Sequence, residues 1–129
     1  MKTDESEVRG KIDISDATRE LVMQGMSEVT DEGGTAGSVF ADYPIKVGGK
    51  TGTAENPRGR DHSTFLSFAP KDNPRIAISV YVENGGFGAT SALPIASLLE
   101  EYYLTDTIRR PALLEYVKNM QLYYPAYDK

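Results

Sequence analysis

The sequence contains no cysteine and only one histidine, His62. The missing cysteines exclude disulfides and thiolate metal sites, and a lone histidine excludes a histidine-rich metal centre. No stretch approaches the roughly 18 apolar residues that a membrane-spanning helix needs, and the polar first residues are not those expected of a signal peptide. We therefore expect no metal and no other cofactor.

A concentration of positive charge is also missing. The net charge is −5 and no basic patch is evident, so we expect no nucleic-acid partner. The hydrophobic share of 40% and the charged share of 26% are ordinary for a soluble globular protein. A chain of 129 residues is long enough for one domain with a modest core.

The spacing of apolar residues predicts both helices and strands. A first helix is expected over Asp16–Thr30, capped by Ser15, because apolar residues recur there at helical spacing. These residues are Ala17, Leu21, Val22, Met26 and Val29. Strands are expected over 45–54, 63–69 and 75–83, and the short turn at 70–74 makes the last two an antiparallel hairpin.

Two more helices are expected near the carboxyl end. One is capped by Thr90 or Ser91 and runs to about Leu104, and a last one runs from Pro111 to Leu122. A three-stranded antiparallel sheet needs a cover on at least one face, which the amphipathic helices supply. The fold class is therefore α+β, with an antiparallel sheet covered by helices.

The sequence Lys50-Thr51-Gly52-Thr53 lies at the end of the first expected strand. Because side chains alternate between the two faces of a strand, Thr51 and Thr53 share one face while Lys50 lies on the other. Two hydroxyls on one face can both donate to a single carboxylate. Gly52 has no Cβ, so a substrate backbone can approach closely.

Two further features would complete such a site. If the strand lies at the sheet edge, its free N–H and C=O groups can bind an extended peptide. Lys50 would add positive potential and assist proton transfer, and the backbone N–H of Thr53 is a candidate oxyanion donor. The competing interpretation is an ordinary solvated strand end, because a short motif alone is a weak signal.

Several further motifs follow in order along the chain. They are Gly33–Ala36 (GGTA), Gly49–Glu55 (GKTGTAE), Asp61–Ser63 (DHS), Phe68–Pro70 (FAP), Val82–Gly88 (VENGGFG) and Pro94–Ala96 (PIA). Together they closely resemble the C-terminal part of the transpeptidase domain of class B penicillin-binding proteins. The stretch Glu83–Gly88 is most similar to the elongation-type group, penicillin-binding protein 2. The resemblance covers roughly residues 16–104.

This resemblance implies a serine-type D,D-transpeptidase that cross-links peptidoglycan and binds β-lactams. In that family a serine attacks the D-alanyl-D-alanine stem peptide and forms an acyl-enzyme. Carried over to this chain, Lys50 is the motif lysine, Thr51 and Thr53 supply the carboxylate hydroxyls with Gly52 between them, and the Thr53 N–H is the oxyanion donor. Cell-wall elongation proteins are the implied partners, and the implied location is the bacterial periplasm, with an anchor in the cytoplasmic membrane.

Two elements of the family pattern are absent. No serine is followed three residues later by lysine, and no Ser-x-Asn or Tyr-x-Asn occurs. We therefore expect a soluble, inactive C-terminal part of a larger protein. Residues 1–14 are expected to be a polar segment at an artificial start, 15–104 the C-terminal portion of the transpeptidase domain, and 105–129 a C-terminal helix and tail. Three of the family's five strands would be present, so the free edge of the 75–83 strand is expected to pair with another copy or to be covered otherwise.

Other interpretations stay open. The chain could derive from a related β-lactamase or β-lactam sensor, although the long loop after the motif disfavours this. It could also be a stand-alone module that captures peptide C-termini on its edge strand. His62 acts either as a base or as a structural or solvated side chain. Arg58 and Arg60 either steer an anion or are solvated, and Phe87 either lines the rim of the site or covers the core.

Overall fold

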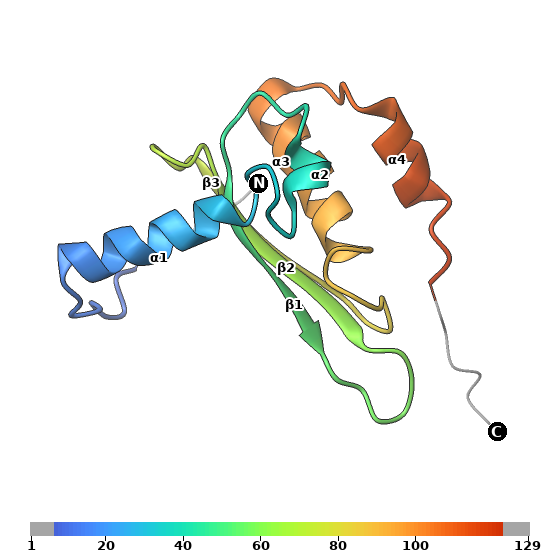
Figure 1. Cartoon of the computed structure of the whole chain (residues 1–129), viewed down its shortest axis with the longest axis horizontal. Helices are drawn as coiled ribbons and strands as arrows, with labels where there is room; N and C mark the ends of the chain where they lie inside the picture. Colours follow the sequence, from blue (N-terminus) through green and yellow to red (C-terminus); the bar gives the residue numbers. More distant parts are fainter. Residues whose placement is uncertain (1–6, 123–129) are drawn as a thin grey trace.

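The computed structural model describes residues 7–122 (Figure 1). The elements in chain order are α1 (Asp16–Glu28), α2 (Gly37–Phe40), β1 (Gly48–Ala54), β2 (His62–Ala69), β3 (Ile76–Val82), α3 (Ala92–Thr105) and α4 (Pro111–Lys118). These elements match the expected ones within a few residues, and they add the short helix α2. The α+β class is confirmed.

The three strands form one antiparallel sheet in the order β1-β2-β3. In β1 and β2, Gly48 pairs with Phe68 and Ala54 with His62; in β2 and β3, Ser63 pairs with Val82. The expected hairpin between β2 and β3 is thus confirmed. Both β1 and β3 lie at the outside of the sheet within the described residues, so each has one edge without a strand partner there.

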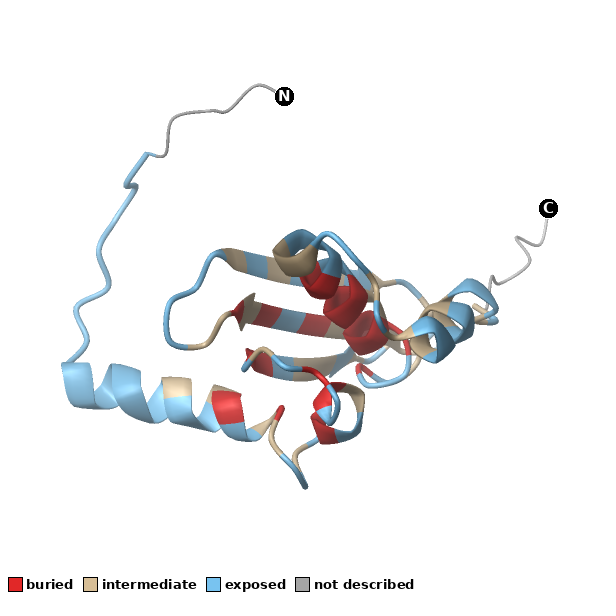
Figure 2. Ribbon diagram, turned by 90° about the horizontal axis from the view of Figure 1, so that it is seen from above, coloured by how far each residue is buried: buried red, intermediate tan, exposed pale blue. Residues whose placement is uncertain are grey.

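The core lies between one face of the sheet and α3. Burial alternates along β2, where Phe65 is 1% exposed and its neighbour Leu66 is 48% exposed. On α3, the side chains of Leu93 and Ala96 are buried against this face. Figure 2 shows the buried residues gathered on β2 and on the side of α3 that meets the sheet. The opposite face of the sheet is much more exposed.

The first helix departs from expectation in its packing. Ser15 caps it as expected, accepting a hydrogen bond from the Thr18 N–H at 3.1 Å. However, α1 points away from the sheet (Figures 1 and 2), and Leu21 and Val22 are 70% and 56% exposed. The prediction that this amphipathic helix covers the sheet was therefore wrong for its first turns, whereas Met26 is half-buried and Val29, just after the helix, packs against the core.

The start of α3 is capped differently from what the sequence suggested. Ser91 occupies the N-cap position, yet its hydroxyl donates to Gly85 O at 3.1 Å and makes no capping bond. The Ala92 N–H in the first turn instead donates to the Ser63 hydroxyl, which comes from β2. The helix end is thus satisfied from the sheet, and this ties α3 to β2.

A buried charge cluster joins the carboxyl-terminal segment to α2 and α3. The Arg110 guanidinium donates to the Glu101 carboxylate at 3.0 Å and to two backbone carbonyls, Val39 O at 2.9 Å and Ser97 O at 2.8 Å. It also lies 4.8 Å from the centre of the Tyr43 ring. Nothing in the local sequence signalled this cluster, because its members are separated by up to 71 positions.

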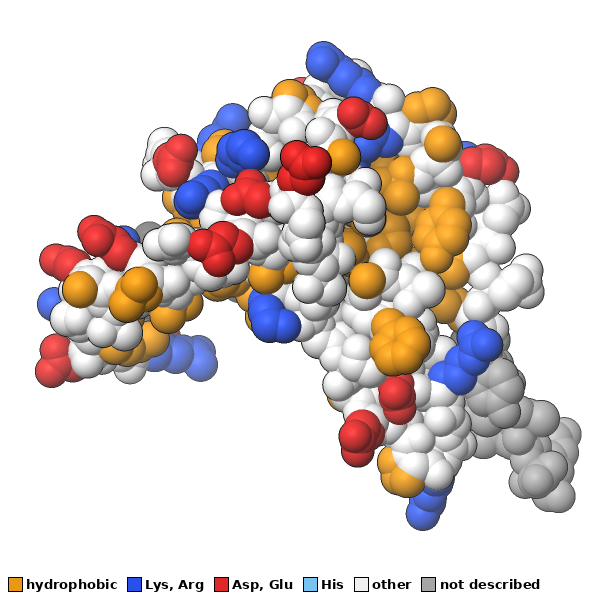
Figure 3. All heavy atoms as spheres, in the orientation of Figure 1, with side chains coloured by type: hydrophobic (Ala, Val, Ile, Leu, Met, Phe, Trp, Pro, Cys, Tyr) orange, Lys and Arg blue, Asp and Glu red, His pale blue; other side chains and the backbone are white. Residues whose placement is uncertain are grey.

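The last helix, α4, ends at Lys118, four residues before the expected end. It packs on α3 through apolar side chains that leave a hollow of about 390 Å³ (Figure 3). The hollow is lined by Ile95, Leu98, Leu99, Tyr102, Ile108, Leu114 and Val117. Residues 7–14 are exposed and have no regular structure, and the tyrosine-rich tail at 123–129 lies outside the described residues.

Within residues 7–122, no helix combines the length and the apolar character that crossing a bilayer requires. In the same part of the chain, no three histidine, cysteine or acidic side chains come together as a metal site would need. The division at residues 14 and 104 stays a prediction.

Candidate carboxylate-binding site

The motif residues lie on β1, at the outer edge of the sheet. Thr51 pairs with the buried Phe65 and Thr53 with the buried Ser63, whereas Lys50 pairs with the exposed Leu66. Paired residues on neighbouring strands share a face of the sheet. Both threonine side chains therefore lie on the face that carries α3, and Lys50 lies on the open face, as the alternation along the strand predicted.

The Thr53 hydroxyl has one protein partner among the described residues. Its Oγ1 accepts a hydrogen bond from the Gly88 N–H at 3.3 Å. A backbone N–H only donates, so this bond leaves the hydroxyl proton of Thr53 free for another acceptor. Thr53 is exposed and Thr51 is half-buried, which leaves both hydroxyls at the end of β1 accessible from outside.

Gly52 is needed for packing within the protein itself. A Cβ at this position would lie 2.3 Å from the Thr64 hydroxyl oxygen on the paired strand. The space above Gly52 on the open face is therefore taken by Thr64. The packing of Thr64 thus accounts for the glycine by itself, and the expectation that Gly52 lets a substrate approach stays a prediction.

Lys50 is exposed, and its ammonium donates to the backbone oxygen of Thr51 at 2.7 Å. This bond holds the positive charge against the strand that carries the two hydroxyls. The lysine thus adds positive potential to this part of the edge, although it lies on the other face. Its part in proton transfer, like the oxyanion role of the Thr53 N–H, stays a prediction.

The loop between β3 and α3 folds back over the β1–β2 hairpin. The Gly86 N–H donates to Asp61 O at 2.8 Å, and the Asn84 N–H donates to Nδ1 of His62 at 3.0 Å. His62 thus uses its Nδ1 lone pair inside the protein and serves a structural role. Phe87 is 71% exposed, so this side chain does not cover the core.

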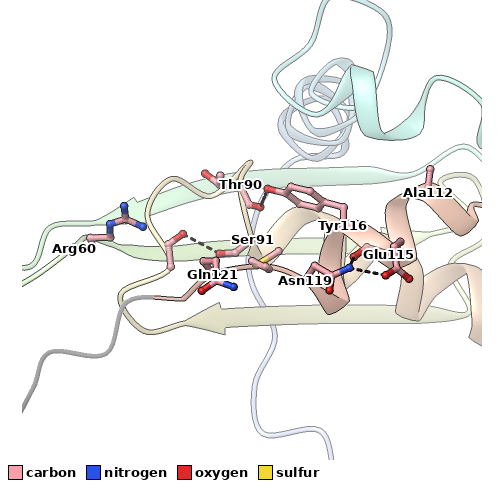
Figure 4. A pocket seen from close by; sticks show the side chains of 10 residues that line it. Arg60, Thr90, Ser91, Ala112, Glu115, Tyr116, Asn119 and Gln121 are labelled. Atoms are coloured by element: carbon pink, nitrogen blue, oxygen red, sulfur yellow. Dashed lines mark hydrogen bonds between the residues drawn. The ribbon is translucent and has the colours of Figure 1, made fainter.

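A groove of about 580 Å³ runs beside this loop and is closed on the other side by α4 (Figure 4). The Tyr116 hydroxyl reaches across from α4 and donates to Thr90 O at 2.8 Å. Arg60, from the loop between β1 and β2, lies at one end of the groove. The contribution of α4 could not be predicted from the sequence, because Tyr116 carries no motif and lies 26 positions from its partner.

The groups at this strand edge are of the kind that bind an anion, and the two family motifs that carry the nucleophile and its base are missing from the sequence. Two hydroxyls, a lysine and a strand edge are the groups that recognise a peptide carboxylate. A serine nucleophile also needs a base within hydrogen-bond reach, and neither Ser-x-x-Lys nor Ser-x-Asn occurs in the sequence. The groups on this strand edge therefore suit the binding of a carboxylate, and their role with a substrate stays a prediction.

Comparison with known proteins points to one family. Residues 1–99 match the model of the penicillin binding protein transpeptidase domain. The peptidoglycan D,D-transpeptidase MrdA of Haemophilus influenzae is 34% identical over 108 residues, which cover 71% of this chain and 17% of that protein.

Two solved structures have the same fold. Pseudomonas aeruginosa PBP2, in complex with WCK 5153, is 41% identical with a TM-score of 0.66, and the match covers 70% of this chain and 20% of that one. Helicobacter pylori PBP2, in complex with MreC, is 29% identical with a TM-score of 0.57, and the match covers 70% of this chain and 18% of that one. The chain thus spans about a fifth of the length of these relatives. It belongs to the penicillin-binding protein transpeptidase domain family, and its relatives include penicillin-binding protein 2 enzymes.

Proposed function

We propose that this chain is the carboxylate-binding portion of a peptidoglycan D,D-transpeptidase. Its ligand is the D-alanyl-D-alanine end of a stem peptide, and β-lactams occupy the same place. The observation that carries this proposal is the placement of Thr51 and Thr53 on one face of an edge strand, with the proton of Thr53 left free by the Gly88 N–H. The identity of the relatives supports it, because MrdA proteins carry this activity in their name.

Each motif residue has its own role in this proposal. The hydroxyls of Thr51 and Thr53 donate to the terminal carboxylate of the peptide, and the Lys50 charge attracts this anion to the strand edge. The Thr53 N–H donates to the carbonyl oxygen as negative charge develops on it. The attacking serine and its lysine base come from polypeptide that this sequence does not contain.

The surroundings of the complete protein are part of the same proposal. We place the parent in the bacterial periplasm with an anchor in the cytoplasmic membrane, and we name cell-wall elongation proteins as its partners. The PBP2–MreC complex of Helicobacter pylori supports the partner assignment. Self-association of this chain through the open edge of β3 is a separate proposal, which rests on the sheet order.

An NMR titration of the ¹⁵N-labelled 129-residue chain tests the binding site. The probes are N-acetyl-D-alanyl-D-alanine and its C-terminal amide, which differ only in the carboxylate. We expect the acid to shift the amide signals of residues 50–53 and 86–88, and to bind about tenfold more tightly than the amide, since one or more charge-assisted hydrogen bonds are lost. Equal affinity for the two probes would refute the proposed function.

A further inference from the structure

One buried hydroxyl fixes the loop that contacts Thr53. Ser63 lies on β2 and is 0% exposed. Its hydroxyl donates to Phe87 O at 3.0 Å and accepts from the Ala92 N–H at 3.0 Å. A hydroxyl has one proton and two lone pairs, so both bonds exist together. This single side chain therefore holds both ends of the segment 87–92 against the sheet.

Gly88 lies between these two anchored ends, pressed onto the backbone of the hairpin. A Cβ at Gly88 would lie 2.5 Å from Gly52 O and 2.7 Å from Thr64 O. Backbone atoms cannot move aside as a side chain does, so only glycine allows this approach. The close approach is what brings the Gly88 N–H within 3.3 Å of the Thr53 hydroxyl.

The resulting bond sets the direction of the Thr53 hydroxyl. One lone pair of its oxygen accepts from Gly88, and among the described residues nothing accepts its proton. A threonine has a stiff χ1 angle, so a bond to its oxygen also selects the side-chain rotamer. Accepting one hydrogen bond strengthens a hydroxyl as a donor in the next one. The arrangement therefore presents a pre-oriented donor at the end of β1.

We propose that Ser63 and Gly88 are positioning residues that hold Thr53 as a proton donor for the ligand carboxylate. The inference rests on the proposed function and adds to it the residues that set the geometry of the hydroxyl. Neither residue touches the ligand. Ser63 acts on the loop, Gly88 acts on Thr53, and only Thr53 contacts the anion.

The hydrogen-bond chain is tested without ligand by amide hydrogen exchange at Gly88. Replacing Ser63 with alanine releases the segment 87–92, and Thr53→Val removes the acceptor. We expect each change to speed Gly88 exchange by about fivefold, the factor that corresponds to one neutral hydrogen bond. Ser67→Ala is the matched control, because Ser67 lies on the same face of β2, is also buried, and bonds neither the loop nor β1.

The preference for the acid over the amide tests what the hydrogen bonds from Ser63 to Thr53 do for ligand binding. We expect Ser63→Ala to reduce the preference for N-acetyl-D-alanyl-D-alanine over its amide by about threefold, since a freed hydroxyl donates less often to the anion. The Ser67→Ala control should keep the full preference. Ser63→Thr restores the hydroxyl and should restore the preference, a rescue that a general loss of stability would not give.

The possible results separate the inference from the proposed function. If the unaltered chain prefers the acid and Ser63→Ala keeps that preference, the positioning role is wrong and the carboxylate site stands. The positioning role is also wrong if Ser63→Ala speeds amide exchange at Gly88 but leaves the preference for the acid unchanged. If the unaltered chain binds acid and amide equally, the proposed function fails and the positioning role falls with it.

Discussion

Glu100 provides a sharp test of how the core is built, because its carboxylate is buried and makes no hydrogen bond among the described residues. It lies on α3 and is 0% exposed, and within the described residues no hydrogen bond reaches either of its carboxylate oxygens. Burial raises the pKa of Glu100 from 4.5 to about 7, and the nearby Ser67 hydroxyl and Arg110 guanidinium oppose that rise. Burial and the Glu100 charge likewise raise the pKa of Tyr43 to about 12.

The sign of the pH dependence follows from this shift. Between pH 4.5 and about 7 the folded chain holds a proton on Glu100 that the unfolded chain has released. The folded state binds more protons, so the free energy of unfolding falls as the pH rises through this window. A pKa difference of about 2.5 corresponds to on the order of 3 kcal/mol, or roughly 10 °C in the melting temperature. The stabilisation of the folded state by the extra proton on Glu100 is fully present below pH 4.5 and lost above about pH 7.

The substitution Glu100→Gln removes the titrating group while keeping its shape. We expect the variant to match the unaltered chain near pH 4.5 and to be more stable than it at pH 8. Urea unfolding curves at half-unit pH intervals measure this, and the difference between the two chains isolates Glu100 from all other groups. Glu55→Gln, at an exposed position on the edge of the site, is the control and should show no such difference.

Two results would refute this reasoning. The first is the same slope of unfolding free energy against pH in the Glu100→Gln variant and the unaltered chain. The second is a variant that is less stable than the unaltered chain at pH 8, which would mean that the ionised carboxylate finds good partners in the core.

Three more predictions follow from the structure. A labelled penicillin should form no covalent adduct with this chain, and a stable labelled band on a denaturing gel would contradict the assignment of the nucleophile to other polypeptide. Arg110→Ala should lower the free energy of unfolding by about 3–5 kcal/mol in urea, because Glu101, 3% exposed, is left as an unpaired buried charge; a loss below 1 kcal/mol would contradict this. Analytical ultracentrifugation should show dimers that form as the concentration rises, and Ser79→Lys, which puts a charge on the open strand β3, should reduce them. A monomer at all concentrations would contradict pairing through that edge.

The placement of the motif residues on the sheet was easier to predict than the packing around them, for a physical reason. The faces of Thr51 and Thr53 follow from the two-residue period of a strand, which depends on neighbouring residues alone. The same locality explains why the strands and the hairpin were found. Once a strand is predicted from the sequence, the face on which each motif residue lies can be predicted as well.

Long-range contacts could not be predicted in this way. The amphipathic pattern of α1 shows which side of the helix needs an apolar partner, but not whether such a partner exists. The cap of α3 comes from Ser63 on a distant strand, although the adjacent Ser91 looked like the natural cap. The bonds of Arg110 to α2 and α3 likewise depend on how the chain returns to itself.

The two roles proposed for Thr53 differ in what they do for catalysis in a complete transpeptidase. The peptide carboxylate keeps its charge throughout acyl transfer, so a hydroxyl that binds it stabilises the ground state and the transition state alike. Such uniform binding lowers KM and leaves kcat unchanged. The backbone N–H faces a carbonyl oxygen whose negative charge appears only in the transition state, so its bond contributes to kcat. On these proposed roles, the side chain of Thr53, supported by Ser63 and Gly88, would set substrate affinity in the complete transpeptidase, whereas its backbone N–H would set the rate. Only the affinity effect can be measured on this chain, because the sequence lacks the Ser-x-x-Lys motif.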